Sequence, residues 1–243
     1  MTGDGRGKTL LGRGAAQACL PVQKGERSAD TDAAPLFGGI GMKIVLASNN
    51  AHKLEELRAI LTTLGMEVVS QKEMGITIEP NENGTTFEEN SYIKARTIMD
   101  CCGLPTIADD SGLMVDVLNG APGIYSARFG GEKCRTDRER LEYLLERMQD
   151  VPDERRTAKF VSVITLLTPE GKKIVARGEC PGVILHAPKG ENGFGYDPVF
   201  YVPEEACTFA QLPAERKNRI SHRARALAAF AEKVRKEREN ADK

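Results

Sequence analysis

The sequence predicts an α/β fold built on a central mixed β-sheet that is flanked by helices. In the first half of the chain, short apolar runs of strand type alternate with helical patterns whose leucines recur every three or four residues. In the second half, two long strand-type segments, 158–167 and 172–180, flank a Pro-Glu-Gly turn and therefore form an antiparallel hairpin. This hairpin makes the sheet mixed, unlike the sheet of a doubly wound dinucleotide-binding fold.

Composition and charge exclude several classes of protein. A net charge of −1 gives no concentration of basic residues for a nucleic-acid polymer, although a few cations suffice for a single nucleotide. No apolar run of about eighteen residues is present to span a membrane, and no signal-peptide pattern opens the chain, so the cytoplasm is the expected location. The six cysteines include no CxxC pair, which argues against a structural zinc site.

Residues 1–41 differ from the rest of the chain in composition. They are rich in glycine and show no sustained hydrophobic period. We interpret them as a flexible, disordered extension, a vector-derived tail or the product of an upstream start codon. Met42 is the expected natural beginning, and residues 42–243 are expected to form a single domain.

The first candidate site lies where a strand meets a helix. The apolar run 43–47 ends in a polar turn, Ser48-Asn49-Asn50, and Lys53 follows in the first turn of a predicted helix. Four leucines recur along this helix at spacings of three and four residues. Free N–H groups and the positive end of the helix dipole favour an anion there, and Lys53 adds a full charge. The arrangement suits a phosphate group, although it lacks the glycines of a Walker motif. Alternatively, the turn only caps the helix.

The second candidate is an acidic loop. Segment 71–84 carries Glu82, and the capping box formed by Thr86 and Glu89 then starts a helix that runs to about Cys102. Capping explains Glu89 without any chemistry, whereas Glu82 is free to reach a metal ion. The alternative for Glu82 is a solvated surface carboxylate.

The centre of the predicted site is a pair of aspartates. A buried strand at 106–108 is followed by Asp109 and Asp110, and then by Ser111-Gly112, which we interpret as a turn. Carboxylates at the end of a buried strand need a cation, a partner or solvent, and ligands bind at the carboxyl ends of strands in α/β sheets. Because neighbours on a strand point to opposite faces, we expect at most one of the two aspartates to point into a site. Alternatively, the segment is only a turn.

The third candidate combines an aromatic loop with a basic segment near the C-terminus. In the glycine-rich segment 190–198, Phe194 and Tyr196 offer faces on which a base can stack, and Asp197 offers an acceptor. Farther on, Lys217 precedes a helix with Ser221 as N-cap and with His222 and Arg223 in its first turn. Cations at that position oppose the helix dipole, which weakly indicates a role in binding a ligand.

Six segments in this order carry a resemblance to a known family: SNNAHKLEEL, GTTFEENSYIKA, ADDSGL, GAPGIYSARF, NGFGYDPVF and KNRISHRARAL. They resemble the signature blocks of the inosine/xanthosine triphosphate pyrophosphatases and cover roughly residues 42–232. The resemblance implies an elongated α/β fold with two lobes and a cleft between them, a homodimer, and Mg²⁺ as cofactor. It also implies hydrolysis of ITP, dITP and XTP to a nucleoside monophosphate and pyrophosphate.

The resemblance also assigns roles to residues. Asp110 is implied as proton acceptor and magnesium ligand. The segment before the second block reads Pro80-Asn81-Glu82-Asn83 where family members often carry paired acids, and we assign Glu82 as the second ligand, with Asn81 as the alternative. The residues implied to bind substrate are Ser48, Asn49, Asn50, Ala51, His52, Lys53, Ser111, Phe194, Gly195, Tyr196, Asp197, Lys217, His222 and Arg223.

Two other functions stay open on the sequence alone. A related enzyme with the same residues could prefer modified pyrimidine triphosphates, and a panel of substrates distinguishes the two. A nucleotide-sensing module without turnover is the second alternative. The presence of Lys53, Asp110 and Lys217 argues against it, and magnesium-dependent release of pyrophosphate would exclude it.

Overall fold

A computed structural model describes residues 42–63 and 65–241, all of which belong to one compact unit. The extension predicted at residues 1–41 lies outside the described residues, so its interpretation and the predicted domain start at residue 42 stay predictions. No helix in the described part of the chain is both long and apolar enough to cross a membrane.

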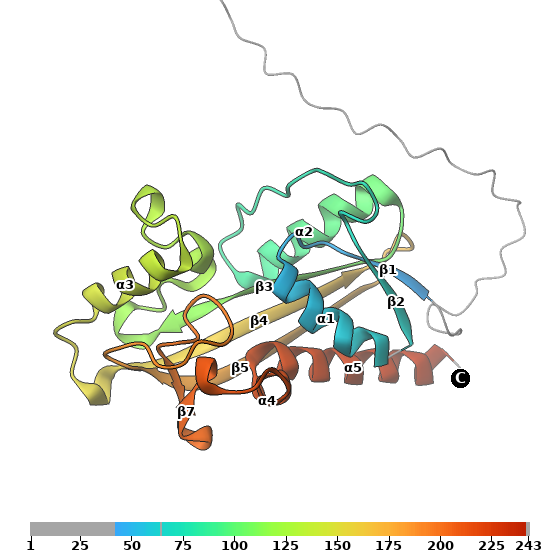
Figure 1. Cartoon of the computed structure of the whole chain (residues 1–243). Helices are drawn as coiled ribbons and strands as arrows, with labels where there is room; N and C mark the ends of the chain where they lie inside the picture. The colour runs from blue at the N-terminus through green and yellow to red at the C-terminus, as the bar shows by residue number, and fades with distance from the viewer. Residues whose placement is uncertain (1–41, 64, 242–243) are drawn as a thin grey trace, which may run out of the picture. The chain divides into compact units, whose positions relative to one another are not determined.

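The described residues form a seven-stranded mixed sheet with strand order β2-β1-β3-β4-β5-β6-β7 (Figure 1). β1 pairs with β2 and β3 in parallel, and all later pairings are antiparallel, which confirms the predicted mixed sheet. The strands are β1 (Met42–Leu46), β2 (Met66–Ser70), β3 (Thr106–Val115), β4 (Thr157–Leu167), β5 (Lys173–Ile184), β6 (Phe200–Val202) and β7 (Cys207–Thr208). The α-helices are α1 (Ala51–Thr63), α2 (Phe87–Cys102), α3 (Asp137–Arg147), α4 (Ala214–Ile220) and α5 (His222–Ala241).

Side-chain caps fix where two of these helices begin. The Thr136 hydroxyl accepts from the N–H of Glu139, whose carboxylate accepts in turn from Thr136, so the capping box predicted for α3 is confirmed. At α2, Thr86 accepts from the N–H of Glu89. The Glu89 carboxylate accepts from the N–H of Thr85, one residue earlier than a standard capping box places it.

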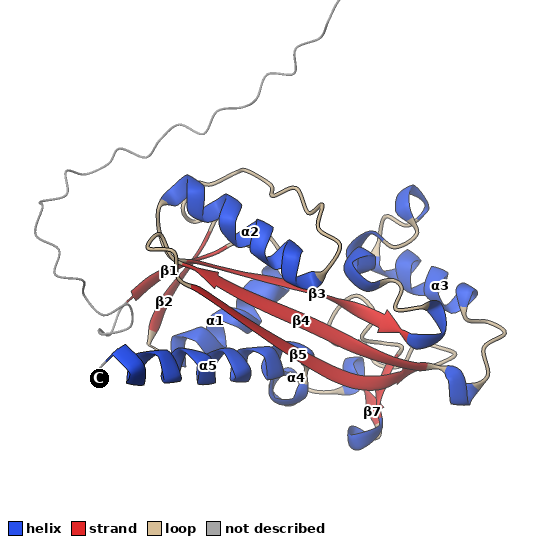
Figure 2. Ribbon diagram, turned by 180° about the vertical axis from the view of Figure 1, so that it is seen from behind, coloured by secondary structure: helices blue, strands red, loops and turns tan. Residues whose placement is uncertain are grey.

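Helices cover both faces of the sheet. α2 packs on one face, where Val45 of β1 and Ala108 of β3 meet Ile98. α1 and α5 pack on the other face, where Ile44 and Ile107 join their apolar side chains (Figures 1 and 2). Alternate residues of β1 and β3 therefore contribute to two separate cores, as the two-residue period of a strand requires.

The predicted turn at Ser111-Gly112 is wrong, because β3 continues through it. All ten residues of β3 pair with β4, with Ser111 opposite Ser162 and Gly112 opposite Val161. The long antiparallel partner overrides the turn preference of the two residues. Gly112 instead allows the backbone at Gly123 to pack closely against β3, because a Cβ at position 112 would collide with the carbonyl of Gly123. The two aspartates therefore lie within the strand and not at its end.

Candidate functional site

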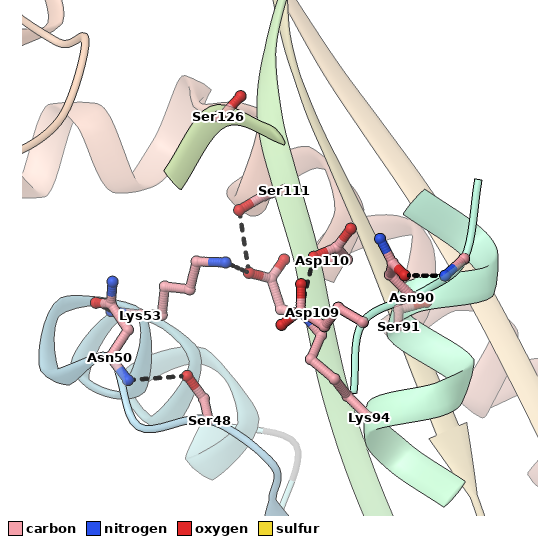
Figure 3. A network of polar contacts seen from close by, with 12 residues as sticks. Ser48, Asn50, Lys53, Asn90, Ser91, Lys94, Asp109, Asp110, Ser111 and Ser126 are labelled. Atoms are coloured by element: carbon pink, nitrogen blue, oxygen red, sulfur yellow. Dashed lines mark hydrogen bonds and ion pairs between the residues drawn. The ribbon is translucent and has the colours of Figure 1, made fainter. Parts of the chain in front are cut away.

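The sheet separates the two neighbouring aspartates of β3. Side chains two positions apart on a strand share a face of the sheet. Asp109 therefore points to the same side as Ile107, towards α1 and α5, and Asp110 points to the same side as Ala108, towards α2 (Figure 3). Both are nearly fully buried, with exposed fractions of 2% and 5%. Buried carboxylates need partners, and the two sides of the sheet supply very different ones.

Asp109 is held by a full set of partners. Its Oδ2 lies 3.0 Å from Nζ of Lys53 and 3.5 Å from a nitrogen of Arg223. The hydroxyls of Ser162 and Ser111 donate to its two oxygens at 2.5 and 3.3 Å. Burial opposes the charge of Asp109, but Lys53 and Arg223 outweigh it and hold the pKa of this carboxyl well below its usual range. Asp109 is therefore a fixed anion that anchors the predicted phosphate lysine.

Asp110 has a sparser environment. Its Oδ1 accepts from Nζ of Lys94 on α2 at 2.7 Å, and the same ammonium lies 3.4 Å from Oε1 of Glu82. The other oxygen, Oδ2, is buried without a hydrogen-bond partner among the described residues. Burial raises the pKa of Asp110, against the opposing effects of Lys94 and Lys53. A carboxylate with a raised pKa and an unused oxygen is suited to accept a proton or to bind a cation.

The start of α1 shows that the two interpretations of its polar turn are compatible. The N–H of Lys53 donates to Oδ1 of Asn50, and the N–H of Asn50 donates to the hydroxyl of Ser48, so the turn does cap the helix. Nevertheless, Asn50 and Lys53 also line the pocket described next. Ser48, Asn49 and Ala51 lie at this helix start outside that pocket, and the side chain of His52 lies outside what the structure describes.

One pocket brings together most residues that were predicted to bind substrate. It lies on the Asp109 side of β3, between α1, the glycine-rich loop and the starts of α3 and α5. The predicted residues that line it are Asn50, Lys53, Ser111, Phe194, Gly195, Tyr196, Asp197, Lys217, His222 and Arg223. The lining residues that were not predicted are Gly112, Ser126, Ala127, Asp137, Arg140 and Phe160.

The glycine-rich loop forms the aromatic wall of this pocket. The hydroxyl of Tyr196 donates to the carbonyl of Ser126 at 2.9 Å, so the buried Tyr196 anchors the loop. The carboxylate of Asp197 accepts from the N–H of Phe194 and from Nζ of Lys217, at 2.9 and 2.7 Å. The Lys217 ammonium lies 4.8 Å from the centre of the Phe194 ring. Phe194 is therefore the aromatic face that this network leaves half-buried at the pocket.

Neither His222 nor Arg223 places an uncompensated positive charge at the start of α5, where such a charge would oppose the helix dipole. Burial first, and then the charge of Arg223, lower the pKa of His222 well below its usual value, so its ring is neutral. The ring stacks on Phe160 with centroids 4.8 Å apart, and its Nδ1 is buried with no hydrogen-bond partner in the described structure. Arg223 is compensated by an ion pair with Glu56 of α1 and donates to the hydroxyl of Ser111 at 3.2 Å.

Several residues of the site were not found from the sequence. Lys94 and Glu56 contact predicted site residues, and Oδ2 of Asp137 accepts from the N–H of Gly195 at 3.0 Å. Arg140 holds Asp137 in turn through a contact of 2.6 Å. The one available signal was Lys94, a lysine on the stripe of α2 that also carries Ala95 and Ile98.

Comparisons with known proteins agree with this arrangement. The sequence profile of the Ham1 family matches residues 44–233. The dITP/XTP pyrophosphatase of Mannheimia succiniciproducens is 51% identical over 195 residues, which cover 79% of this chain and 98% of that protein. The dITP/XTP pyrophosphatase of Vibrio cholerae is 50% identical over 198 residues, which cover 81% and 98%.

Solved structures show the same fold. A HAM1 protein from Coxiella burnetii superposes with a TM-score of 0.74 at 41% identity, over 80% of this chain and 99% of that one. A nucleoside-triphosphatase / dITP/XTP pyrophosphatase from Mycobacterium abscessus superposes with a TM-score of 0.64 at 46% identity, over 77% and 98%. These matches confirm the resemblance that the six sequence blocks indicated, and the chain belongs to the Ham1 family.

Proposed function

We propose that this protein hydrolyses the deaminated purine nucleotides ITP, dITP and XTP to a nucleoside monophosphate and pyrophosphate. The observation that carries the proposal is the pocket that joins Lys53 at a helix start to the neutral ring of His222. Asp110 does not line this pocket, but it precedes the pocket residue Ser111 on β3, beyond the last position that pairs with β1, and the charge of Lys53 acts on it there. The names of the family relatives support the same activity.

A polyphosphate would bind at the α1 end of the pocket. The N-terminus of a thirteen-residue helix and the ammonium of Lys53 both favour a negative charge there. However, the cations of the pocket already have carboxylate partners: Lys53 with Asp109, Lys217 with Asp197, Arg223 with Glu56 and Arg140 with Asp137. The pocket therefore offers little unbalanced positive charge, and a polyphosphate needs an additional cation.

Glu82 and Asp110 fit a magnesium ion. The free, buried Oδ2 of Asp110 and the carboxylate of Glu82 are hard oxygen ligands, and both carboxylates share Lys94 as neighbour. The described residues contain no group of three or more His, Cys, Asp or Glu that could hold a metal ion. A Mg²⁺ site needs only one or two carboxylates, because phosphate and water oxygens supply the other ligands. When bound, the ion would neutralise charge on the phosphates. Asn81 is exposed and is the weaker candidate.

Asp110 would orient the attacking water and accept its proton. The raised pKa of this carboxyl makes its ionised form a stronger base than an ordinary aspartate. Lys53 and the start of α1 would stabilise the charge that develops on the leaving pyrophosphate. Asp109 would contribute indirectly by fixing Lys53, whose Nζ it holds at 3.0 Å.

Selectivity for the base would come from the start of α5. Donors from His222 and Arg223 can meet the 6-oxo group of hypoxanthine or xanthine, whereas adenine presents a 6-amino donor at the same place. Nδ1 of His222 is buried and has no partner in the described part of the chain. In the tautomer that carries the proton on Nδ1, a 6-oxo group would accept from it, whereas a 6-amino group would leave it unpaired. A mismatch of that kind can cost on the order of 10⁴-fold in kcat/KM.

Pyrophosphate release from ITP, XTP, GTP, ATP and dUTP, each with and without Mg²⁺, tests the proposal. We expect Mg²⁺-dependent release from ITP and XTP and far slower release from ATP. Preferred turnover of dUTP would favour the pyrimidine alternative. Binding of nucleotide without any release would identify a sensor.

We also propose a homodimer, for which the support is the resemblance of the sequence blocks to the family. Light scattering of the purified protein tests it, because a homodimer gives twice the mass of the chain. A mass equal to one chain across the measured concentrations would contradict it.

A further inference from the structure

Lys94 of α2 is buried at a position where its charge needs an explanation. Its side chain is 10% exposed, and it lies on the stripe of the helix that also carries Ala95 and Ile98. Lysine is almost never fully buried unless it is paired, because its ammonium loses hydration. The partners of this ammonium therefore indicate what the residue does.

The ammonium of Lys94 lies between the two carboxylates that are proposed to hold the metal ion. Its Nζ is 2.7 Å from Asp110 and 3.4 Å from Glu82. No other cation in the described part of the chain forms an ion pair with both of these carboxylates. Lys53 pairs with Asp109 on the other side of β3, and Arg128 is 3.8 Å from Glu82 with a side chain that is 45% exposed. Lys94 is therefore the one described cation that forms an ion pair with both carboxylates.

A divalent ion on the same carboxylates would lie close to this ammonium. Like charges repel strongly where water is scarce. In addition, the ammonium of Lys94 already neutralises part of the negative charge of the two carboxylates that would attract the ion. The two cations are not mutually exclusive in space, since Oδ2 of Asp110 is buried and has no other partner among the described atoms. Lys94 should therefore weaken metal binding without blocking it.

We propose that Lys94 is an internal counter-ion that lowers the affinity of the Glu82–Asp110 site for a divalent cation while no nucleotide is bound. This inference rests on the proposed function, because it assumes that these two carboxylates hold the metal. Its consequence is that the metal binds chiefly together with a polyphosphate, whose oxygens supply further ligands. Without Lys94, the site would bind the metal ahead of the nucleotide.

A calorimetric titration of the protein with Mn²⁺, in the absence of nucleotide, tests the inference. Lys94→Gln should bind Mn²⁺ about tenfold more tightly than the wild type, at the lower end of the effect of a neighbouring charge. Lys94→Arg keeps the charge and should bind like the wild type. Lys159→Gln is the control, because Lys159 lies four positions along β4 from Val163, which pairs with Asp110, and its partner at 2.8 Å is Glu179, so the variant should leave Mn²⁺ binding unchanged.

Equal or weaker Mn²⁺ binding by Lys94→Gln would overturn the inference, whatever the rate of pyrophosphate release. Absence of release from every nucleotide, by contrast, would count against the proposed function alone. If Lys94→Gln does not fold, the wild type with ¹³Cε-labelled lysine decides. Saturating Mg²⁺ should shift the Lys94 signal, which the Lys94→Arg variant assigns, and an unmoved signal would overturn the inference.

Discussion

Asp109 and Asp110 are neighbours of the same type in one strand, yet the structure gives them opposite properties. Asp109 has four partners and a lowered pKa, whereas Asp110 has one hydrogen-bonded lysine, an unpartnered oxygen and a raised pKa. The difference arises because a strand directs adjacent side chains to opposite faces of the sheet, where different helices supply the neighbours. Asp109 therefore anchors the site, and Asp110 is available for chemistry.

The largest expected effect is the loss of turnover in Asp110→Asn. An amide is no proton acceptor and a poor ligand for Mg²⁺, so kcat for ITP should fall by about 10³-fold or more, while the nucleotide still binds. Rapid assays of pyrophosphate release and calorimetry with ITP measure the two quantities. Near-normal kcat would remove Asp110 from its proposed role.

Asp109→Asn should act first on stability. The substitution leaves the charges of Lys53 and Arg223 without their shared carboxylate, and breaking a buried ion pair costs about 3–5 kcal/mol. Urea unfolding measures the change. Asp116→Asn is the control, because Asp116 is exposed and accepts one hydrogen bond from Thr157. A loss of less than about 1 kcal/mol for Asp109→Asn would contradict the anchoring role.

The contribution of Asp109 to stability should also depend on pH in a defined direction. Its pKa is lower in the folded than in the unfolded protein, so the stabilisation is complete above the unfolded value of about 4. It is lost as the pH falls through the folded value. The stability difference between wild type and Asp109→Asn, measured by urea unfolding, should therefore be constant above about pH 4 and shrink progressively below it, as the pH falls from the unfolded pKa towards the folded one.

Variants at the start of α5 should change specificity more than binding of the phosphates. His222→Ala or Arg223→Ala removes donors near the proposed base position, and the ratio of kcat/KM for ITP over ATP should fall by about tenfold to hundredfold. Binding of pyrophosphate alone is the internal control and should change less. An unaltered ITP-to-ATP ratio would place base recognition elsewhere.

A smaller effect is expected from Asp137, which acts through the glycine-rich loop. Asp137→Ala removes the acceptor for the N–H of Gly195, so the loop should hold Phe194 less firmly and KM for ITP should rise about tenfold at nearly constant kcat. Asp137→Asn can still accept and should restore KM. Arg138→Ala on the same helix is the control, since Arg138 pairs with Glu142 in solvent.

The sequence was sufficient for most of the architecture because local signals carried it. Capping residues such as Thr136 act within one helical turn, and the long hairpin followed from its own turn. The strand that holds the aspartates was only partly predicted. Its continuation through Ser111 depends on pairing with Ser162, which is remote in sequence.

The candidate site was predictable in its residue types and not in its pairings. Lys53 and Asp110 were identified, but the carboxylate next to Lys53 is that of Asp109. Glu56 lies 167 positions from its partner Arg223, so no local pattern could reveal the pair. The buried position of Lys94 follows from the helix stripe alone, whereas its two carboxylate partners follow only from the fold.

A titration of the aspartate side chains tests the division between the two carboxylates most directly. The carboxyl ¹³C signals of Asp109 and Asp110, assigned with the two Asn variants, would be followed by NMR from pH 8 downward in the folded protein. We predict that Asp110 titrates above the ordinary aspartate value of about 3.9 and that Asp109 stays ionised until the protein unfolds. The reverse order, or equal ordinary values, would contradict the account.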